Sequence, residues 1–340
     1  MGGGIGINGL GRIGRLTLRR LLERERTTGL RVEAVNSLYP AETIAHLLRY
    51  DSIHGKLDAS LKAEGGRLLA NGRAIEVLCE RDPTRIPWSS SGVSTVIEST
   101  GQFNDAEGAG KHLSAGAEYV VVTAPGKGMD ITIVKGVNEE DFDRARHRLV
   151  STASCTTNCV APVLHALDRA YGVVDGWITA VHAYTNDQRH LDNPHSDLRR
   201  ARACTQSIVP TTTGIGKALT NVLPHLADSV HGLSIRVPTP NVSIADMTVT
   251  LKRSTDVDQL RRVLLARQSA CGDVLGFVDE PLVSVDFVGD SRSAVIDGLA
   301  LAVYGNQAKI LAWYDNEWGY SCRVVDMTES IALPSTVISG

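Results

Sequence analysis

The amino-acid sequence predicts an α/β protein of two domains, in which a doubly wound parallel sheet is followed by an α+β domain with a mainly antiparallel sheet. Three observations lead to this prediction. The chain has 340 residues, whereas a typical domain has about 150. Short apolar runs alternate with helical patterns through the first 150 residues. The second half instead alternates apolar with polar residues, which is typical of a sheet with one face in water.

The first domain is predicted from five short apolar runs, each typical of a strand that is buried on both faces. Between the first two runs lies a helical pattern, with Leu18, Leu21 and Leu22 on one face and Gly29 as its stop. Strand, helix and strand form a βαβ unit, and repeated βαβ units build the doubly wound Rossmann arrangement. The five runs are Gly4 to Asn8, Val32 to Asn36, Thr95 to Ile97, Tyr119 to Thr123 and Ile131 to Val134.

The second domain is predicted from a run in which Met247, Val249 and Leu251 alternate with polar residues. This period of two indicates a strand with one buried face. Further strand candidates follow, and short strands in this order are most easily arranged antiparallel. They are Leu282 to Val288, Ala294 to Asp297 and Ala308 to Tyr314.

The charge and the cysteine pattern exclude several classes of protein. Lys and Arg number 35 and Asp and Glu number 38, so the net charge of −3 is too weak to drive binding to nucleic acid. The six cysteines show no CxxC motif and no disulfide framework, and the Cys and His residues lack metal-site spacing. The sequence shows no membrane span and no signal peptide. We therefore expect a cytoplasmic protein without a metal, a membrane or a nucleic-acid partner.

Gly9, Gly11 and Gly14 form a G-x-G-x-x-G motif between the first predicted strand and the first predicted helix. Glycines at these positions permit close approach of the backbone, and the helix N-terminus offers amide donors to a pyrophosphate. The motif in this context indicates a dinucleotide-binding loop. The alternative is a glycine-rich turn that binds no ligand.

The end of the second predicted strand indicates which dinucleotide binds. An acidic residue at this place usually accepts hydrogen bonds from the ribose of NAD. Asn36 and Ser37 stand there instead, and neither repels the 2′-phosphate of NADP as a carboxylate would. The sequence thus favours NADP or the use of both cofactors. The alternative is that Ser37 only caps a loop and that NAD binds through its other contacts.

Cys155 and His182 are the candidate nucleophile and base. Cys155 precedes an apolar stripe of helical spacing, and a helix N-terminus favours a thiolate. Pro162 within the stripe predicts a helix that is kinked or starts later than Cys155, so we expect the dipole to contribute little. His182 lies where an apolar run opens into a polar loop, a suitable place for a general base. A small buried hydrophobe and a satisfied core histidine are the alternatives.

Two segments further along the chain are candidates for binding phosphate. Asp197 to Arg202 has three arginines within four residues, and Thr211 to Gly214 supplies hydroxyls and backbone amides. A solvated surface and an ordinary turn are the alternatives.

Four segments together resemble the phosphorylating glyceraldehyde-3-phosphate dehydrogenases, and the resemblance covers essentially the whole chain. The segments are Gly6 to Arg15, Ala153 to Cys159, Asp197 to Arg202 and Trp313 to Tyr320. The resemblance implies a dinucleotide-binding domain of residues 1–154 and 316–340 and a catalytic domain of residues 155–315. It also implies a homotetramer in which the loop after His182 reaches a neighbour's cofactor site.

The resemblance implies a role for each site residue. Cys155 attacks the substrate aldehyde, His182 is its base, the nicotinamide takes a hydride, and inorganic phosphate cleaves the thioester to 1,3-bisphosphoglycerate. The implied substrate-binding residues are Ser154, Thr156, Arg200, Thr213 and Gly214, with Thr185 and Arg236 at the substrate phosphate. The implied cofactor-binding residues are Gly9, Gly11, Arg12, Ile13, Gly14, Asn36, Ser37, Arg81, Thr100, Gly101, Thr123, Asn193 from a neighbouring subunit, and Asn316 at the nicotinamide carboxamide.

Within this family, the loop Tyr184 to Gln188 and the missing acid at Ser37 resemble the bacterial branch of NADP-preferring gluconeogenic enzymes and erythrose-4-phosphate dehydrogenase. Thr211 to Lys217 keeps the phosphorylating form of the phosphate loop. We therefore expect glyceraldehyde 3-phosphate and inorganic phosphate as substrates. One alternative is an erythrose-4-phosphate dehydrogenase, which would hydrolyse its thioester, and a remote one is an inactive cofactor-binding module.

Overall fold

A computed structural model describes residues 3–333, which divide into two units. The first unit contains residues 3–133, 139–153 and 321–333, and the second contains residues 134–138 and 154–320. The chain therefore passes between the units after residues 133, 138, 153 and 320. The sequence analysis places boundaries after residues 154 and 315 and does not anticipate the short segment 134–138.

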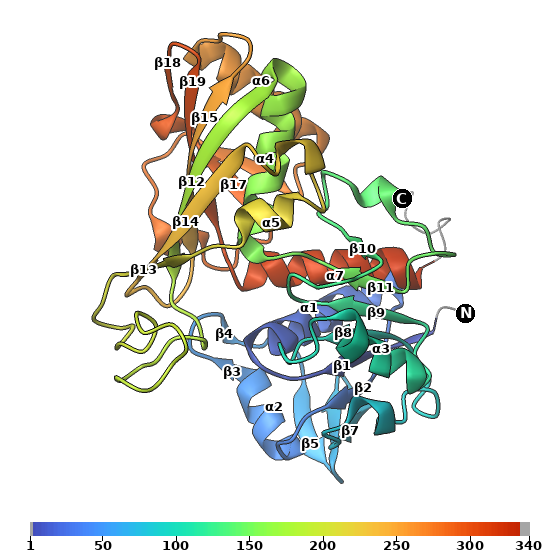
Figure 1. Cartoon of the computed structure of the whole chain (residues 1–340). Helices are drawn as coiled ribbons and strands as arrows, with labels where there is room; N and C mark the ends of the chain where they lie inside the picture. Colours follow the sequence, from blue (N-terminus) through green and yellow to red (C-terminus); the bar gives the residue numbers. More distant parts are fainter. Residues whose placement is uncertain (1–2, 334–340) are drawn as a thin grey trace. The chain divides into compact units, whose positions relative to one another are not determined.

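The first unit is built on a nine-stranded sheet (Figure 1). Its order is β10-β11-β9-β8-β1-β2-β7-β6-β5, and the strands from β10 to β7 are parallel. The predicted doubly wound parallel sheet is thus confirmed. The parallel strands are β1 (Gly4–Asn8), β2 (Val32–Asn36), β7 (Arg73–Leu78), β8 (Val93–Glu98), β9 (Tyr119–Val122), β10 (Ile131–Thr132) and β11 (Leu149–Ser151).

Helix α1 (Arg12–Thr28) connects β1 to β2 and packs on both strands. It ends at Gly29, whose φ of 71° lies in the left-handed region that favours glycine. The predicted stop is thus confirmed. Three more helices belong to this unit wholly or in part, namely α2 (Ala41–Arg49), α3 (Ala106–Ser114) and, from residue 321 on, α7 (Trp318–Ala332).

One end of this sheet is antiparallel, which the sequence analysis missed. Strand β5 (Leu61–Glu64) forms a hairpin with β6 (Arg67–Ala70), and β6 forms a second hairpin with β7. Strand β3 (Tyr50–Asp51) pairs separately with β4 (Gly55–Lys56). These segments carry several charged residues because one of their faces meets water, so they do not show the continuous apolar runs of the central strands.

The second unit is built on an eight-stranded sheet with the order β13-β14-β12-β15-β19-β17-β16, and β18 also pairs with β19. Two neighbouring pairs are parallel, β12 with β14 and β16 with β17, and the other pairs are antiparallel. The mainly antiparallel sheet is therefore confirmed. The strands are β12 (Val173–Ala183), β13 (Val209–Thr212), β14 (Val230–Val237), β15 (Ser243–Leu251), β16 (Leu275–Val278), β17 (Ala294–Asp297), β18 (Ala302–Tyr304) and β19 (Gln307–Tyr314).

Three helices gather over one face of this sheet (Figure 1). Helix α4 (Cys155–Tyr171) packs on β12, β15, β17 and β19, and both α5 (Ile215–Leu219) and α6 (Val257–Ala270) pack on α4. On β15, Met247, Val249 and Leu251 are buried and the residues between them are half-buried. The predicted alternation is thus confirmed, and it defines the face that packs into the core.

The start of α4 differs from one expectation. Pro162 predicts a helix that is kinked or starts later than Cys155. The later start is wrong, because the helix begins at Cys155 and contains Pro162 in its interior. Proline lacks the N–H that would bond one turn back. Every member of the predicted apolar stripe is buried, so packing favours the helix despite that loss. The stripe is Val160, Val163, Leu164, Leu167 and Tyr171.

The predicted strand from Leu282 to Val288 is wrong. Residues Ser284–Phe287 form a 3₁₀ helix, and the carboxylate of Asp286 accepts a hydrogen bond of 2.8 Å from the backbone N–H of Val283. Phe287 is buried and stacks on Trp313 with ring centroids 5.3 Å apart. A short apolar run does not by itself distinguish these conformations.

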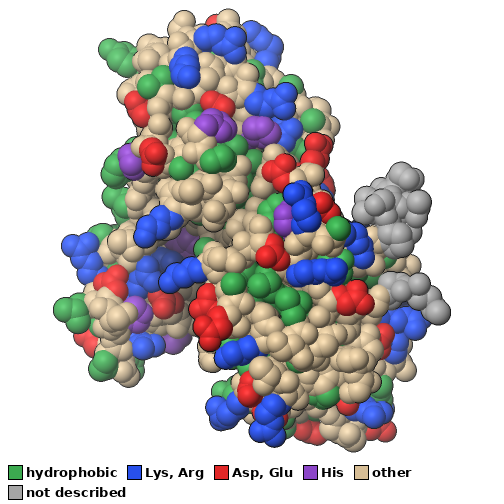
Figure 2. All heavy atoms as spheres, turned by 45° about the vertical axis from the view of Figure 1, so that its right-hand side comes forward, with side chains coloured by type: hydrophobic (Ala, Val, Ile, Leu, Met, Phe, Trp, Pro, Cys, Tyr) green, Lys and Arg blue, Asp and Glu red, His purple; other side chains and the backbone are tan. Residues whose placement is uncertain are grey.

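Acidic and basic side chains are interspersed over the face shown in Figure 2. This mixture agrees with the net charge of −3. Within residues 3–333, no helix is both long enough and apolar enough to span a membrane.

The core position of Leu167 gives a first prediction. Its side chain is 0% exposed in α4, so Leu167→Ala is expected to lower the free energy of unfolding by about 2–5 kcal/mol in urea titrations. Leu265→Ala is the control, because Leu265 is 37% exposed on α6 and should cost much less. Equal losses in the two variants would contradict this packing.

Candidate active site

The glycine motif lies at the carboxyl end of β1 and the start of α1. Gly9 has a φ of +91°, and a Cβ on Gly14 would lie 2.1 Å from the Gly9 carbonyl oxygen. A Cβ on Gly11 would meet no atom of the chain within 4 Å. Gly9 and Gly14 are therefore required by the fold, whereas the space at Gly11 fits a group that approaches the helix N-terminus. A dinucleotide pyrophosphate fits this loop.

Arg12 and Ile13 form the first turn of α1. The guanidinium of Arg12 pairs with both carboxylate oxygens of Asp51. Burial alone would raise the pKa of Asp51, but hydrogen bonds from Arg12 and from two backbone N–H groups hold it below its ordinary value. Because Arg12 has this partner, the backbone amides of the turn are the donors best placed for a pyrophosphate.

The predicted ribose residues lie after β2. The Asn36 amide donates 2.8 Å hydrogen bonds to Asn8 Oδ1 and to the Glu80 carbonyl oxygen, and its own oxygen accepts from the Glu80 N–H. These bonds use the Asn36 side chain within the protein. Ser37 is buried, and its Oγ accepts a 3.3 Å hydrogen bond from the backbone N–H of Tyr39. Its hydroxyl hydrogen remains a donor for a ligand.

The remaining predicted cofactor residues of this unit lie on neighbouring loops. Thr100 follows β8 and donates its backbone N–H to Glu98 Oε1 at 2.7 Å. Thr123 follows β9 and donates its N–H to the Glu98 carbonyl oxygen at 3.0 Å. Gly101 has a φ of 73° and is exposed, as is Arg81. The loops that follow β1, β8 and β9 thus meet at one edge of the sheet.

The second unit brings Cys155 and His182 together. Cys155 is the first residue of α4, which Ser154 caps by accepting a hydrogen bond from the Thr157 N–H. His182 lies one residue before the end of β12. Cys155 Sγ is 3.5 Å from His182 Nε2, within hydrogen-bonding distance for sulfur. This contact favours the nucleophile and base over a small buried hydrophobe and a core histidine.

The tautomer of His182 follows from its second nitrogen. Nδ1 lies 2.7 Å from the carbonyl oxygen of Ala183, which only accepts, and 3.1 Å from Nη1 of Arg236, which only donates. The shorter contact decides, because Arg236 Nη1 has the same carbonyl oxygen as its acceptor, so Nδ1 carries the hydrogen. The neutral ring then has a lone pair on Nε2, and this lone pair faces the thiol of Cys155. The imidazole is therefore arranged to take the thiol proton.

Burial and a nearby cation set the charges of the pair. Burial, aided by the guanidinium of Arg236, lowers the pKa of His182 to about 3. Burial also raises the pKa of the Cys155 thiol, while Arg236 acts in the opposite direction. The resting pair is thus neutral thiol and neutral imidazole, with a cation close enough to stabilise a thiolate when one forms.

The residues predicted to bind phosphate include two arginines, Arg236 and Arg200, whose positive charges act on His182. Arg236 Nη1 donates to the Ala183 carbonyl oxygen at 3.1 Å and lies 3.5 Å from Thr185 Oγ1. Arg200 pairs with Asp187, and its Nε donates to Thr211 Oγ1 at 3.0 Å. The positive charge of Arg200 also helps lower the pKa of His182, so it acts on the same centre.

Thr213 and Gly214 lie between β13 and α5 and are at least partly accessible. Thr156 is buried, and its hydroxyl lies 3.0 Å from the hydroxyl of Tyr314, so it supports the core of the site. Asn193 lies in the loop after β12, where its N–H donates to the Ala201 carbonyl oxygen.

Ser243 is a residue that sequence reasoning missed. Its Oγ accepts from the Ala183 N–H at 3.0 Å and donates to Asn316 Oδ1 at 2.9 Å. The Asn316 amide is thereby turned so that its nitrogen can donate to a ligand. Strand pairing creates this contact across 73 residues of chain, so no local pattern indicates it.

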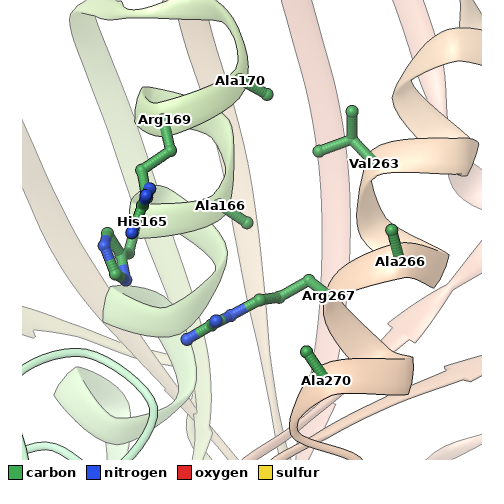
Figure 3. A pocket seen from close by; sticks show the side chains of 8 residues that line it. All are labelled: His165, Ala166, Arg169, Ala170, Val263, Ala266, Arg267 and Ala270. Carbon is green, nitrogen blue, oxygen red and sulfur yellow. The ribbon is translucent and has the colours of Figure 1, made fainter.

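A separate hollow of about 320 Å³ lies between α4 and α6 (Figure 3). None of the predicted site residues lines it. Its lining is His165, Ala166, Arg169, Ala170, Val263, Ala266, Arg267 and Ala270. Within residues 3–333, no group of three or more His, Cys, Asp or Glu is placed to hold a metal ion.

A glycine loop at the edge of a parallel sheet, in the first unit, and a thiol–imidazole pair among arginines, in the second, are typical of dinucleotide-dependent dehydrogenases. Comparison with known proteins is more specific. Residues 4–106 match the NAD binding domain of glyceraldehyde 3-phosphate dehydrogenase, and residues 154–316 match its C-terminal domain. The chain belongs to the glyceraldehyde 3-phosphate dehydrogenase family.

Curated relatives are similar over nearly the whole chain. Glyceraldehyde-3-phosphate dehydrogenase 2 of Bacillus subtilis is 50% identical over 330 residues, which cover 96% of each chain. Glyceraldehyde-3-phosphate dehydrogenase of Geobacillus stearothermophilus is 48% identical over 330 residues, covering 96% of this chain and 98% of the relative. The Streptomyces avermitilis glyceraldehyde-3-phosphate dehydrogenase 2 is 47% identical over 328 residues.

The open space at Gly11 gives the second prediction. Gly11→Ala is expected to leave stability unchanged, because its Cβ would meet no atom of the chain within 4 Å. The methyl group would obstruct the pyrophosphate and raise the Kd for NAD and NADP about tenfold or more. Gly110→Ala is the control, since a Cβ there also meets nothing within 4 Å but lies in α3. Calorimetric Kd values that match for both variants would contradict this loop as the binding site.

Proposed function

We propose that this chain is a phosphorylating glyceraldehyde-3-phosphate dehydrogenase. The observation that carries the proposal is the pair formed by Cys155 Sγ and His182 Nε2, 3.5 Å apart beside Arg236. The family and the names of the relatives support the substrate. An inactive binding module would have no need for this pair.

The reaction follows from the neutral resting pair. His182 Nε2 takes the thiol proton, the Cys155 thiolate adds to the aldehyde carbon, and His182 returns the proton to the carbonyl oxygen, which becomes the hydroxyl of a hemithioacetal. NAD(P), when bound, supplies the acceptor for a hydride. His182 takes the hydroxyl proton as the carbonyl re-forms, which leaves a thioester on Cys155.

Inorganic phosphate completes the catalytic cycle beside Arg236 and Arg200. An oxygen of inorganic phosphate attacks the thioester carbon, the carbon–sulfur bond breaks, and Cys155 leaves as thiolate. The product is 1,3-bisphosphoglycerate. Arg236 and Thr185 are placed to bind the substrate phosphate, and Arg200, Thr213, Gly214 and Ser154 to bind inorganic phosphate. In the erythrose-4-phosphate alternative, water would replace phosphate.

The cofactor preference belongs to the same proposal. Ser37 stands where an acid would repel a 2′-phosphate, and its hydroxyl hydrogen is a donor that a phosphate oxygen could accept. Arg81 is exposed after β7 and carries a positive charge. These two residues support use of NADP at least as well as NAD, as in the NADP-preferring gluconeogenic branch.

The proposed homotetramer accounts for exposed apolar groups around the site. Leu191 and Leu198 are 79% and 80% exposed in the loop after β12, and Trp177 on β12 is 51% exposed. A second subunit that covered these side chains would remove apolar surface from water. We propose that the loop reaches a neighbour's cofactor site through Asn193. The cytoplasmic location remains a proposal based on the cysteine pattern.

The covalent step gives the third prediction. Cys155→Ser is expected to keep the fold and NAD(P) binding but to lose nearly all dehydrogenase activity, because serine is not ionised where a thiol can be. His182→Asn should slow turnover by about 10²–10⁴-fold and also slow alkylation of Cys155 by iodoacetamide. Wild-type turnover by Cys155→Ser would refute a thioester mechanism.

The phosphate step gives the fourth prediction. Oxidation of glyceraldehyde 3-phosphate should require inorganic phosphate and yield an acyl phosphate that hydroxylamine traps. Erythrose 4-phosphate should have the lower kcat/KM. A phosphate-independent rate with the higher kcat/KM for erythrose 4-phosphate would instead identify the hydrolysing alternative.

The residue after β2 gives the fifth prediction. Wild-type protein should use NADP at least as well as NAD, and Ser37→Asp should shift the ratio of kcat/KM toward NAD by about tenfold or more, because one carboxylate repels the 2′-phosphate. Ser37→Ala is the control for loss of the hydroxyl without added charge. Strong NAD preference in the wild type would contradict the proposed role of Ser37.

A further inference from the structure

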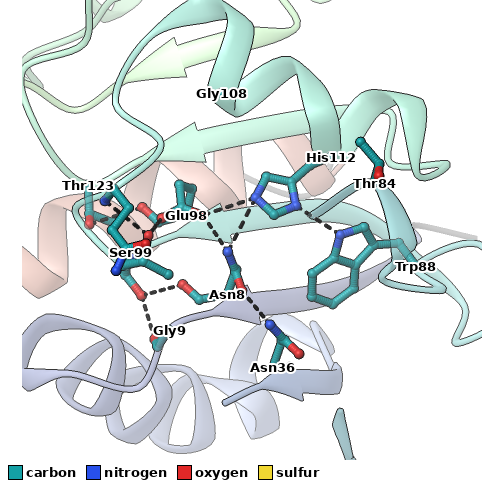
Figure 4. A network of polar contacts seen from close by, with 12 residues as sticks. Asn8, Gly9, Asn36, Thr84, Trp88, Glu98, Ser99, Gly108, His112 and Thr123 are labelled. Atoms are coloured by element: carbon teal, nitrogen blue, oxygen red, sulfur yellow. Dashed lines mark hydrogen bonds and ion pairs between the residues drawn. The ribbon is translucent and has the colours of Figure 1, made fainter. Parts of the chain in front are cut away.

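A buried polar network lies under the dinucleotide loop of the first unit (Figure 4). Its centre is Glu98, the last residue of β8, which is 1% exposed. Glu98 Oε1 accepts the backbone N–H of Thr100 at 2.7 Å and also its hydroxyl, which in turn accepts from Gln102. Oε2 accepts from Asn8 Nδ2 at 2.6 Å.

His112 on α3 supplies a further donor to Glu98. The indole N–H of Trp88 donates to His112 Nδ1 at 3.0 Å, and an indole nitrogen can only donate. Nδ1 is therefore the bare nitrogen of a neutral ring, and the hydrogen is on Nε2, 2.9 Å from Glu98 Oε2. Asn8 Nδ2 lies farther from Nε2, at 3.5 Å, and donates to Glu98 at 2.6 Å. Trp88 and His112 are both 0% exposed. The indole N–H of Trp88 can only donate, so it fixes which nitrogen of His112 carries the hydrogen.

The donor set identifies Glu98 as a carboxylate. Two N–H groups, one ring N–H and one hydroxyl point at its two oxygens, and each of these partners is a neutral group. A protonated carboxyl would lose the bond from the Thr100 hydroxyl, because its own hydrogen would occupy that contact or stand against one of the N–H donors. A glutamine would likewise place an amide N–H₂ against at least one donor. Only a carboxylate accepts all four bonds.

The network continues from Glu98 across three neighbouring strands. Asn8 at the end of β1 donates to Glu98 and accepts from Asn36 at the end of β2. Asn36 in turn bonds both backbone polar groups of Glu80, which follows β7. The residue after Glu80 is Arg81. The buried bonds therefore run from the loop after β8 to the segment proposed to meet the ribose.

The loop after β8 also holds the glycine loop in place. Ser99 Oγ lies 2.6 Å from the Gly9 carbonyl oxygen and 3.0 Å from that of Asn8. A Cβ on Gly9 would lie 2.8 Å from the backbone nitrogen of Thr100, the group that Glu98 fixes. On the other side, Thr123 donates to the Glu98 carbonyl oxygen through its N–H and its hydroxyl.

We propose that Glu98 and His112 are positioning residues for dinucleotide binding, in which the carboxylate and the neutral imidazole hold together the loops after β1, β2 and β8. The inference rests on the dinucleotide binding proposed above. Neither side chain reaches the ligand. Each side chain acts through loops whose backbone groups contact the ligand. Loss of either side chain should therefore weaken binding of the whole dinucleotide and leave the thiol chemistry intact.

The test compares Glu98→Gln with Glu329→Gln. Glu329 forms a two-pronged ion pair with Arg24 of α1, at 2.8 and 2.9 Å, in the same unit. Both variants should have a lower Tm. Only Glu98→Gln should raise the calorimetric Kd for NAD and NADP, by about tenfold or more. It should raise KM for the cofactor while kcat at saturation and cofactor-free alkylation of Cys155 stay within about twofold.

His112 provides a second pair of variants in case Glu98→Gln fails to fold. His112→Gln keeps an N–H donor for Glu98 and should bind NAD and NADP nearly as wild type, whereas His112→Leu should raise the Kd. Wild-type Kd values in Glu98→Gln or His112→Leu, or equal increases in Glu329→Gln, would overturn the positioning role. Failure of the wild-type protein to bind either dinucleotide would instead refute the proposed function.

Discussion

The parallel pairing of β12 with β14 places His182 opposite Arg236, and both side chains bond the carbonyl oxygen of Ala183. That oxygen lies 2.7 Å from His182 Nδ1 and 3.1 Å from Arg236 Nη1, so it orients the imidazole and holds the guanidinium next to the ring. The lone pair that accepts the proton and the charge that stabilises a thiolate are therefore set together. A slip of one residue in this register would turn His182 to the other face of the sheet, away from Cys155 on α4.

Much of the fold could be predicted from the sequence because its elements have local patterns. The strands β1, β2 and β17 lie where the apolar runs predict them, and α1 ends at Gly29. The hairpins of β5, β6 and β7 escaped notice because their polar faces interrupt the apolar pattern. The run from Leu282 to Val288 has the apolar pattern of a strand but does not form one. Its Phe287 packs into the core from a 3₁₀ helix.

The candidate site divides along the same line. Cys155 and His182 could be singled out because each stands at the junction of an apolar run and a polar segment. Their surroundings depend on contacts between distant residues, such as Ser243 with Asn316 across 73 positions. Asn36 shows the limit most clearly. Its position predicts a cofactor contact, but no local pattern indicates that its amide also bonds Glu80, 44 residues away.

The passage of α7 back into the first unit has a consequence for how the protein is made. Val324, Val325 and Ile331 of this helix are buried, and Glu329 anchors it to Arg24 of α1. A ribosome completes residues 3–153 long before it reaches this helix, and the whole second unit emerges in between. The nascent amino-terminal unit therefore stays incomplete, without the buried side chains of α7, until residues 321–332 have been made. An unfinished domain of this kind exposes apolar surface that chaperones shield.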